Sequence, residues 1–138
     1  MSTITLPDHV RAFLAEPRYA AIATSDADGR PRQAVIWYLL EGDELVINSA
    51  TGRRWPTNLL RDPRLSVAVA DARDGYRWVG LEATAEPIRD QRIAQADIAA
   101  MARRYDDPEG AARRIRRFEA QERITFRVRI HGIHDHLS

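Results

Sequence analysis

Cysteine and lysine are both absent from this chain. Without a thiol, the protein has no disulfide framework, no thiolate metal site and no cysteine nucleophile. Without lysine, Schiff-base and lysine-nucleophile mechanisms are excluded, and all 21 side chains of the lysine and arginine class are arginines. Any enzymatic chemistry must therefore use other side chains or a bound cofactor.

Long apolar runs and an excess of one charge are lacking as well. No stretch approaches the roughly 20 apolar residues that span a bilayer, and the amino-terminal residues contain no basic and apolar signal region. We therefore expect a cytoplasmic protein that does not bind membranes. The 20 acidic residues nearly balance the arginines, leaving a net charge of +1, so no overall field attracts nucleic acid. Arginines 103–104, 113–114 and 116–117 lie near acidic residues on predicted helices, where we expect local ion pairs on a solvated face.

Familiar catalytic signatures are also missing. The sequence has no Gly-x-Ser-x-Gly elbow, P-loop, Gly-x-Gly-x-x-Gly or His-Glu-x-x-His pattern and no recognisable carboxylate pair. His131, His134 and His136 lie with Asp135 in a terminal tail that has no second group of ligands, so we predict no metal site. We assign no catalytic side chain, and an enzyme of this kind would depend on a borrowed cofactor.

What is present is the composition of a globular domain. Hydrophobic residues make up 44% and charged residues 30% of the 138 positions. No repeat or linker divides the chain, so residues 1–138 are predicted to form a single domain. Apolar alternation predicts strands, and helical spacing predicts helices. The predicted strands are residues 19–25, 32–40, 44–49, 65–70, 76–88 and 124–130. The predicted helices are residues 8–16, 52–62, 91–105 and 108–121.

The order of these elements indicates an α+β fold that is mainly β. A turn containing Gly29 joins the first two strands into a hairpin. Residues 32–40 carry apolar side chains on both faces, which a barrel interior and a dimer interface would bury together. Six antiparallel strands with a few peripheral helices predict a closed barrel without free edges.

Residues 48–58, Asn-Ser-Ala-Thr-Gly-Arg-Arg-Trp-Pro-Thr-Asn, join a predicted strand to a predicted helix. Free backbone amides at a helix start favour an anion. Hydroxyl groups are offered by Ser49, Thr51 and Thr57. Arg53 and Arg54 offer guanidinium groups that match phosphate oxygens. One interpretation is a phosphate cradle. The alternative is a helix capped by Ser49 or its neighbour Thr51, with solvated arginines.

Trp37, Trp55 and Trp78 have flat faces suited to a slot for a tricyclic ring. Trp37 lies on the strand that precedes the phosphate candidate. The alternative interpretation places these rings in the barrel core or in a dimer interface. The two interpretations are compatible.

Several short motifs follow one another along the chain. In order they are Ala21-Ile-Ala-Thr24, Asp28-Gly-Arg-Pro31, Val35-Ile-Trp-Tyr38, Leu45-Val-Ile-Asn-Ser49, Arg53, Asn58-Leu-Leu-Arg-Asp-Pro-Arg64, Ser66-Val-Ala-Val69 and Trp78-Val-Gly-Leu-Glu-Ala-Thr-Ala85. Together they resemble the pyridoxamine-5′-phosphate-oxidase-like superfamily of split β-barrels, and within it the deazaflavin (coenzyme F420)-dependent oxidoreductases. The resemblance extends over nearly the whole chain. It implies a six-stranded antiparallel split β-barrel, working as a homodimer with the cofactor at the subunit interface.

The resemblance also implies a set of cofactor-binding residues. Arg53 matches the phosphate-binding arginine of the family, and Trp78 resembles a position that the partner subunit contributes. The remaining candidates match the segment beside the ring, the polar strand end and the phosphate loop with its helix; they are Val35, Ile36, Trp37, Asn48, Ser49, Arg54, Thr57 and Asn58. Trp55 stands where the family commonly has lysine. Arg54 is the candidate replacement, although neighbouring helical positions point about 100° apart.

The implied activity is hydride transfer between reduced F420 and a small conjugated organic substrate, with the protein contributing proximity and electrostatics. One alternative is an FMN-dependent enzyme of the same fold, motivated by the missing lysine at Trp55. Another is a non-catalytic flavin-binding protein, since no catalytic side chain is visible. The sequence does not separate these three.

Overall fold

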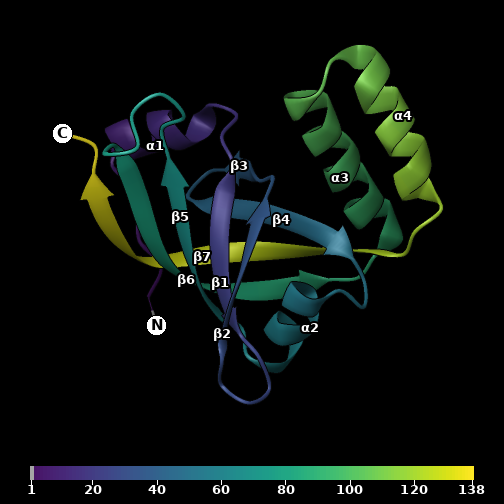
Figure 1. Cartoon of the computed structure of the whole chain (residues 1–138), viewed down its shortest axis with the longest axis horizontal. Coiled ribbons are helices and arrows are strands. Elements are labelled where there is room, and N and C mark those ends of the chain that lie inside the picture. The colour runs from purple at the N-terminus through teal and green to yellow at the C-terminus, as the bar shows by residue number, and fades with distance from the viewer. Residues whose placement is uncertain (1) are drawn as a thin grey trace.

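The computed structural model describes residues 2–138, in which seven antiparallel strands form one curled sheet with four helices around it (Figure 1). The strands are β1 Ala20–Ser25, β2 Pro31–Ile36, β3 Leu39–Glu41, β4 Glu44–Ala50, β5 Arg64–Ala70, β6 Trp78–Ile88 and β7 Arg123–His136. The helices are α1 Asp8–Ala15, α2 Arg54–Arg61, α3 Gln91–Tyr105 and α4 Pro108–Glu119. The strand order is β2-β1-β5-β6-β7-β4-β3. The predicted mainly β, α+β class is confirmed.

The predicted strand over residues 32–40 is interrupted, and this changes six strands to seven. The break falls between β2 and β3, at Trp37 and Tyr38. There the backbone N–H of Tyr38 donates to the Tyr105 hydroxyl, 3.3 Å away. This hydroxyl replaces the carbonyl acceptor that a neighbouring strand would provide. The Tyr38 ring turns into the core, and its hydroxyl donates to the carbonyl oxygen of Leu14 at 2.9 Å.

The sheet is a half-barrel with two edges rather than a closed barrel. In the described part of the chain, β2 and β3 end the strand order and do not pair with each other. In the single chain the outer face of β2 is uncovered and Val35 is 73% exposed, so the burial of this face in a dimer interface stays a prediction. The β1–β2 hairpin is confirmed, with Gly29 at φ +85°, a conformation that glycine adopts without a steric penalty.

Alternating side chains fill the concave side of the sheet. In β5, Leu65, Val67 and Val69 are buried while the residues between them are exposed, as the alternation predicts. Helix α1 covers one end of the half-barrel with Val10, Phe13 and Leu14, which share one helical face. This core fixes the positions of β4 and β7, and these two strands carry part of the functional site.

Helices α3 and α4 form a hairpin at the end of the molecule opposite the two chain termini (Figure 1). Asp90 caps α3, Asp107 caps α4, and Pro108 opens α4, where its missing N–H is harmless. Ile98 and Met101 of α3 pack against Val46 on the convex side of the sheet. The hairpin therefore stands beside β4 and leaves a pocket between itself and the sheet. No helix in residues 2–138 combines the length and apolar character that crossing a membrane requires.

Candidate functional site

A pocket of about 440 Å³ opens between the α3–α4 hairpin and the sheet. Its lining comes from β2, β4, the start of α2, α3, α4 and the start of β7. Six of the predicted site residues line it together: Val35, Ile36, Trp37, Asn48, Ser49 and Arg53. The structure thus brings the polar end of β4 and the predicted phosphate arginine to one place.

Arg123, at the start of β7, is the buried cation of this pocket. It is only 4% exposed, and its Nε donates to Asn48 Oδ1 at 3.0 Å while its Nη1 donates to Gln121 Oε1 at 2.6 Å. No carboxylate of residues 2–138 forms an ion pair with it. Burial, and then the positive charge of Arg53, lower the pKa of Arg123 to about 10. A buried guanidinium with neutral partners is stabilised by an anion, so this end of the pocket suits a phosphate.

The charged residues that line the pocket also favour an anionic ligand. Arg53, Arg114, Arg117 and Arg123 line it, and no aspartate or glutamate of the described chain does. Arg114 alone of these four has an ion-pair partner in residues 2–138, with its Nε 2.8 Å from Asp106 Oδ2. Three cations therefore remain for a ligand, which favours an anionic one.

The start of α2 supports an anion next to Arg53. Arg53 occupies the capping position of the helix, and within the described residues no side chain caps it. The interpretation in which Ser49 or Thr51 caps this helix is therefore wrong. The Arg53 side chain is exposed at the pocket. The backbone carbonyl oxygen of Arg53 accepts from the N–H and the hydroxyl of Thr57 at 3.1 and 2.7 Å. Backbone N–H groups in the first turn of a helix have no partner within that helix and can bind an anion.

Asn48 lines the pocket, yet its amide is used inside the protein. Its Nδ2 donates to the carbonyl oxygen of Ala94 at 2.9 Å and to Thr125 Oγ1 at 3.0 Å. The Thr125 hydroxyl in turn donates to Asp97 Oδ2 at 2.8 Å, and burial raises the pKa of Asp97. Asn48 therefore links the pocket to α3.

Stacked aromatic rings form one wall. Trp37 stacks on Tyr105, and Tyr105 stacks on Tyr19 with centroids 5.6 Å apart. The Arg114 guanidinium lies over the Trp37 ring, 5.2 Å from its centroid. Tyr19 is 62% exposed at the pocket rim. Of these rings, Trp37 and Tyr19 line the pocket, where aromatic side chains can contact a planar ring.

Within one chain the three tryptophans do not share a slot. Trp55 borders the pocket, but its ring is buried against Phe126 with centroids 5.8 Å apart. Trp78 lines a different pocket, of about 460 Å³ over β5, β6 and β7, where it stacks on His134. The prediction that Trp78 completes a partner's site stays a prediction.

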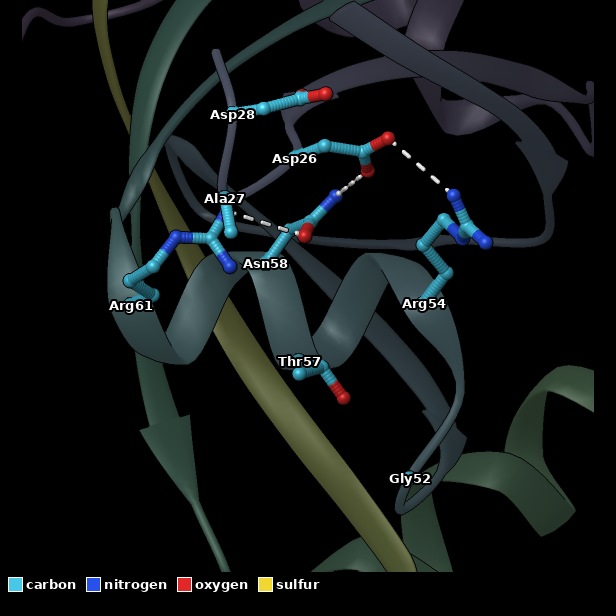
Figure 2. Close-up of a pocket in the computed structure, with 8 residues that line it drawn as sticks. All are labelled: Asp26, Ala27, Asp28, Gly52, Arg54, Thr57, Asn58 and Arg61. Atoms are coloured by element: carbon cyan, nitrogen blue, oxygen red, sulfur yellow. Dashed lines mark hydrogen bonds and ion pairs between the residues drawn. The ribbon is translucent and has the colours of Figure 1, made fainter. Parts of the chain in front are cut away.

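Arg54, Thr57 and Asn58 line a second pocket of about 650 Å³ on another side of α2 (Figure 2). Figure 2 shows Arg54 and Asn58 reaching toward Asp26, with Arg54 Nη1 3.3 Å and Asn58 Nδ2 2.9 Å from its carboxylate. Hydrogen bonds from Arg32 and then Asn58 lower the pKa of Asp26 to about 2. Arg54 and Asn58 thus tie the β1–β2 turn to α2, and their role in cofactor binding stays a prediction.

The carboxyl-terminal histidines lie in a strand, not in the tail that the sequence suggested. β7 continues to His136 because β6 is long enough to pair with it. The ring of His131 contacts Thr84 Oγ1 at 2.7 Å and the carbonyl oxygen of Ser2 at 2.8 Å. Across residues 2–138 no group of three potential ligands is placed to hold a metal ion.

Among the lining residues that sequence reasoning missed, those with a charged or amide side chain are Arg114, Arg117, Gln121 and Arg123. We expected the α4 arginines on a solvated face, but Arg114 reaches back to Asp106 across the helix start and Arg117 borders the pocket. A signal was available, because positions 114, 117, 118 and 121 recur at helical spacing and share one face. For Arg123 the only available signal was a basic residue before a predicted strand.

The sequence from residue 6 to residue 133 matches the pyridoxamine 5'-phosphate oxidase family. No curated protein matches it significantly. The structure superposes on an F420 reductase with a TM-score of 0.75 at 22% identity, covering 94% of this chain and 98% of that chain. It also superposes on the conserved hypothetical protein Rv2991 from Mycobacterium tuberculosis (TM-score 0.78, 21% identity, 97% and 87% covered).

A third similar structure is HutZ, described as a heme storage protein, from Vibrio cholerae, with a TM-score of 0.72 at 20% identity, covering 96% of this chain and 95% of that chain. At these identities the likeness establishes the fold, the split β-barrel, and leaves cofactor and substrate open. The family match spans nearly all of the sequence, and the chain therefore belongs to the pyridoxamine 5'-phosphate oxidase family.

Proposed function

We propose that the protein is an oxidoreductase that binds a phosphorylated deazaflavin, coenzyme F420, in the pocket beside the α3–α4 hairpin, with FMN as the alternative cofactor. The observation that carries this proposal is Arg123, a buried cation whose partners are neutral. Together with Arg53 and the uncapped start of α2, it makes a phosphate site. The ring of Trp37, which stacks on Tyr105, lines the same pocket.

The residues of the pocket divide the work. Arg53 and Arg123 bind the phosphate, and the aromatic wall orients a planar ring. Ile98, Met101 and Phe118 are apolar and keep water from that side of the pocket. When bound, the reduced ring supplies the hydride that passes to a conjugated substrate.

We propose further that two copies associate through the outer face of the sheet. There Val35, Ala21, Ala68, Gly80 and His134 are directly paired across five neighbouring strands, and so lie in one row. The three middle residues, Ala21, Ala68 and Gly80, have small side chains, so a second sheet can approach the row between Val35 and the Trp78 ring, which packs over Gly80. Because Trp78 lies beside this row, a second copy would carry Trp78 toward the partner's pocket.

Fluorescence titration of the purified chain with F420, FMN and heme tests the proposed function. We expect tighter binding of F420 than of FMN and weak binding of heme. Tighter binding of FMN than of F420 would support the alternative, an FMN-dependent enzyme. Binding of heme, or of none of the three, contradicts it. Turnover of an enone or quinone with the reduced cofactor then separates an enzyme from a binding protein.

A further inference from the structure

Behind the phosphate site, a chain of hydrogen bonds runs from α3 through two strands to Arg123. Asn48 and Thr125 are directly opposite each other in the β4–β7 pair. Asp97 accepts from Thr125, Thr125 accepts from Asn48, and Asn48 accepts from Arg123. Asn48 is 7% exposed and Thr125 is fully buried, so this chain is largely shielded from water.

The direction of these bonds is fixed at both ends. The Asp97 carboxylate can only accept, so the Thr125 hydroxyl donates to it and keeps its oxygen free to accept. The carbonyl oxygen of Ala94 can also only accept, so it requires the NH₂ end of the Asn48 amide. Rotating that amide by half a turn would place its oxygen against the carbonyl oxygen of Ala94. Asn48 is therefore held with its oxygen toward Arg123.

The charge of the partner matters as much as its direction. A carboxylate beside Arg123 would orient the guanidinium and also cancel its charge. An amide orients the guanidinium without cancelling the charge. Gln121 Oε1, the other side-chain acceptor for Arg123, is an amide oxygen too. Both side-chain acceptors therefore leave the positive charge of Arg123 to a ligand.

We propose that Asn48 is the residue that sets the specificity of this pocket for phosphorylated ligands, by aiming Arg123 while leaving its charge uncancelled. Asn48 acts through Arg123 and is a positioning residue rather than a contact to the phosphate. The inference rests on the proposed function, since it assumes that the pocket binds a flavin or deazaflavin phosphate.

The test compares a ligand with its phosphate-free form. FMN and riboflavin make one pair; F420 and the deazaflavin riboside without its phosphate-linked tail make the other. The preference is the ratio of the two dissociation constants, measured by fluorescence with the pair that the wild type binds. Asn48→Asp places a carboxylate against Arg123 at almost unchanged volume. We expect the preference for the phosphorylated form to fall about tenfold or more. The dissociation constant of the phosphate-free form should stay unchanged.

A second variant and a control keep the test decisive. Asn48→Asp removes the donor to Ala94, which can impair folding, so Gln121→Glu brings a carboxylate to Arg123 from the other side and is expected to reduce the preference in the same direction. Ala112→Glu adds the same charge at an exposed position of α4 outside this pocket and is expected to leave the preference unchanged.

Three results overturn the inference. If the wild type binds both forms equally, the phosphate site and the proposed function fail with it. If the wild type prefers the phosphorylated form and both acidic variants, once folded, keep that preference, only the role of Asn48 fails. If the variants weaken both forms to the same extent, Asn48 has a structural role alone.

Discussion

The indole ring of Trp37 lies parallel to the phenol ring of Tyr105, with 4° between their planes and 5.2 Å between their centroids. Trp37 follows β2 and Tyr105 ends α3, so this contact joins the strand break to the helical hairpin. The Tyr105 hydroxyl also accepts from the backbone N–H of Tyr38 and donates to the carbonyl oxygen of Arg18. One side chain thus supports both the aromatic wall and the interruption that separates β2 from β3.

Tyr105→Phe should separate these two roles. The ring stack remains, but the buried N–H of Tyr38 loses its acceptor, so we expect the free energy of unfolding to fall by about 1–3 kcal/mol. Cofactor affinity should change little. Urea denaturation and fluorescence titration measure the two quantities. Tyr76→Phe is the matched control, since Tyr76 is 83% exposed, and its stability should stay within about 0.5 kcal/mol of the wild type. Equal stability of both variants would contradict this account.

Arg53→Ala tests the phosphate site from its exposed side. Loss of one charge-assisted contact should weaken binding of the phosphorylated cofactor by about 1.5–3 kcal/mol, which is about 10- to 150-fold. Unfolding should be nearly unaffected, because Arg53 forms no ion pair in the described chain and is exposed. Arg73→Ala removes an exposed arginine that does not line the pocket and should bind the cofactor normally. If Arg53→Ala binds the cofactor with the dissociation constant of the wild type, the phosphate does not bind at Arg53.

Local patterns were enough to predict most elements of the fold. Alternation in β5 and the Gly29 turn depend on neighbours in the sequence, and both are confirmed. The strand break at Tyr38 depends on the hydroxyl of Tyr105, 67 positions away. Such a distant hydrogen bond leaves no mark in the local pattern, so residues 32–40 looked like one strand.

The same distinction explains the site. Asn48, Ser49 and Arg53 lie close in sequence at the end of a strand, and their shared pocket followed from that position. Arg123 reaches the same pocket only because β7 pairs with β4, a contact between segments 75 residues apart. Arg54 was the candidate to replace the lysine that the family has at the position of Trp55. Adjacent helical positions point in different directions, and Arg54 pairs with Asp26 instead of lining the first pocket.

Asp26 should make the stability depend on pH in acid. Folding lowers its pKa from 3.8 to about 2, so the unfolded chain takes up this proton first. The stabilisation is therefore complete above about pH 5 and is lost as the pH falls through about 4 to 2. Asp26→Asn should be less stable than the wild type at neutral pH, and this difference should shrink over the same range. Urea midpoints measured from pH 7 to pH 2 give both curves.

Asp62→Asn is the comparison for Asp26→Asn. The pKa of Asp62 is also lowered to about 2, chiefly by Arg64, but these residues are two positions apart and can meet in the unfolded chain as well. Asp26 instead joins β1 to Arg32 of β2 and Asn58 of α2. We therefore expect a larger loss for Asp26→Asn than for Asp62→Asn. The reverse order would show that the turn contributes less than the local pair.

Ala68→Arg tests the proposed association of two copies. Ala68 is exposed in β5 at the middle of the row that runs from Val35 to His134. A long cationic side chain there would hold two outer faces apart, so we expect a dimer of the wild type to become a monomer in sedimentation velocity. If the partner's Trp78 completes the pocket, cofactor affinity should fall by about tenfold in the same variant. Ala72→Arg, in an exposed loop, should remain dimeric and bind normally. A monomeric wild type, or a dimeric Ala68→Arg, would place the interface elsewhere and make the pocket of a single chain the whole site.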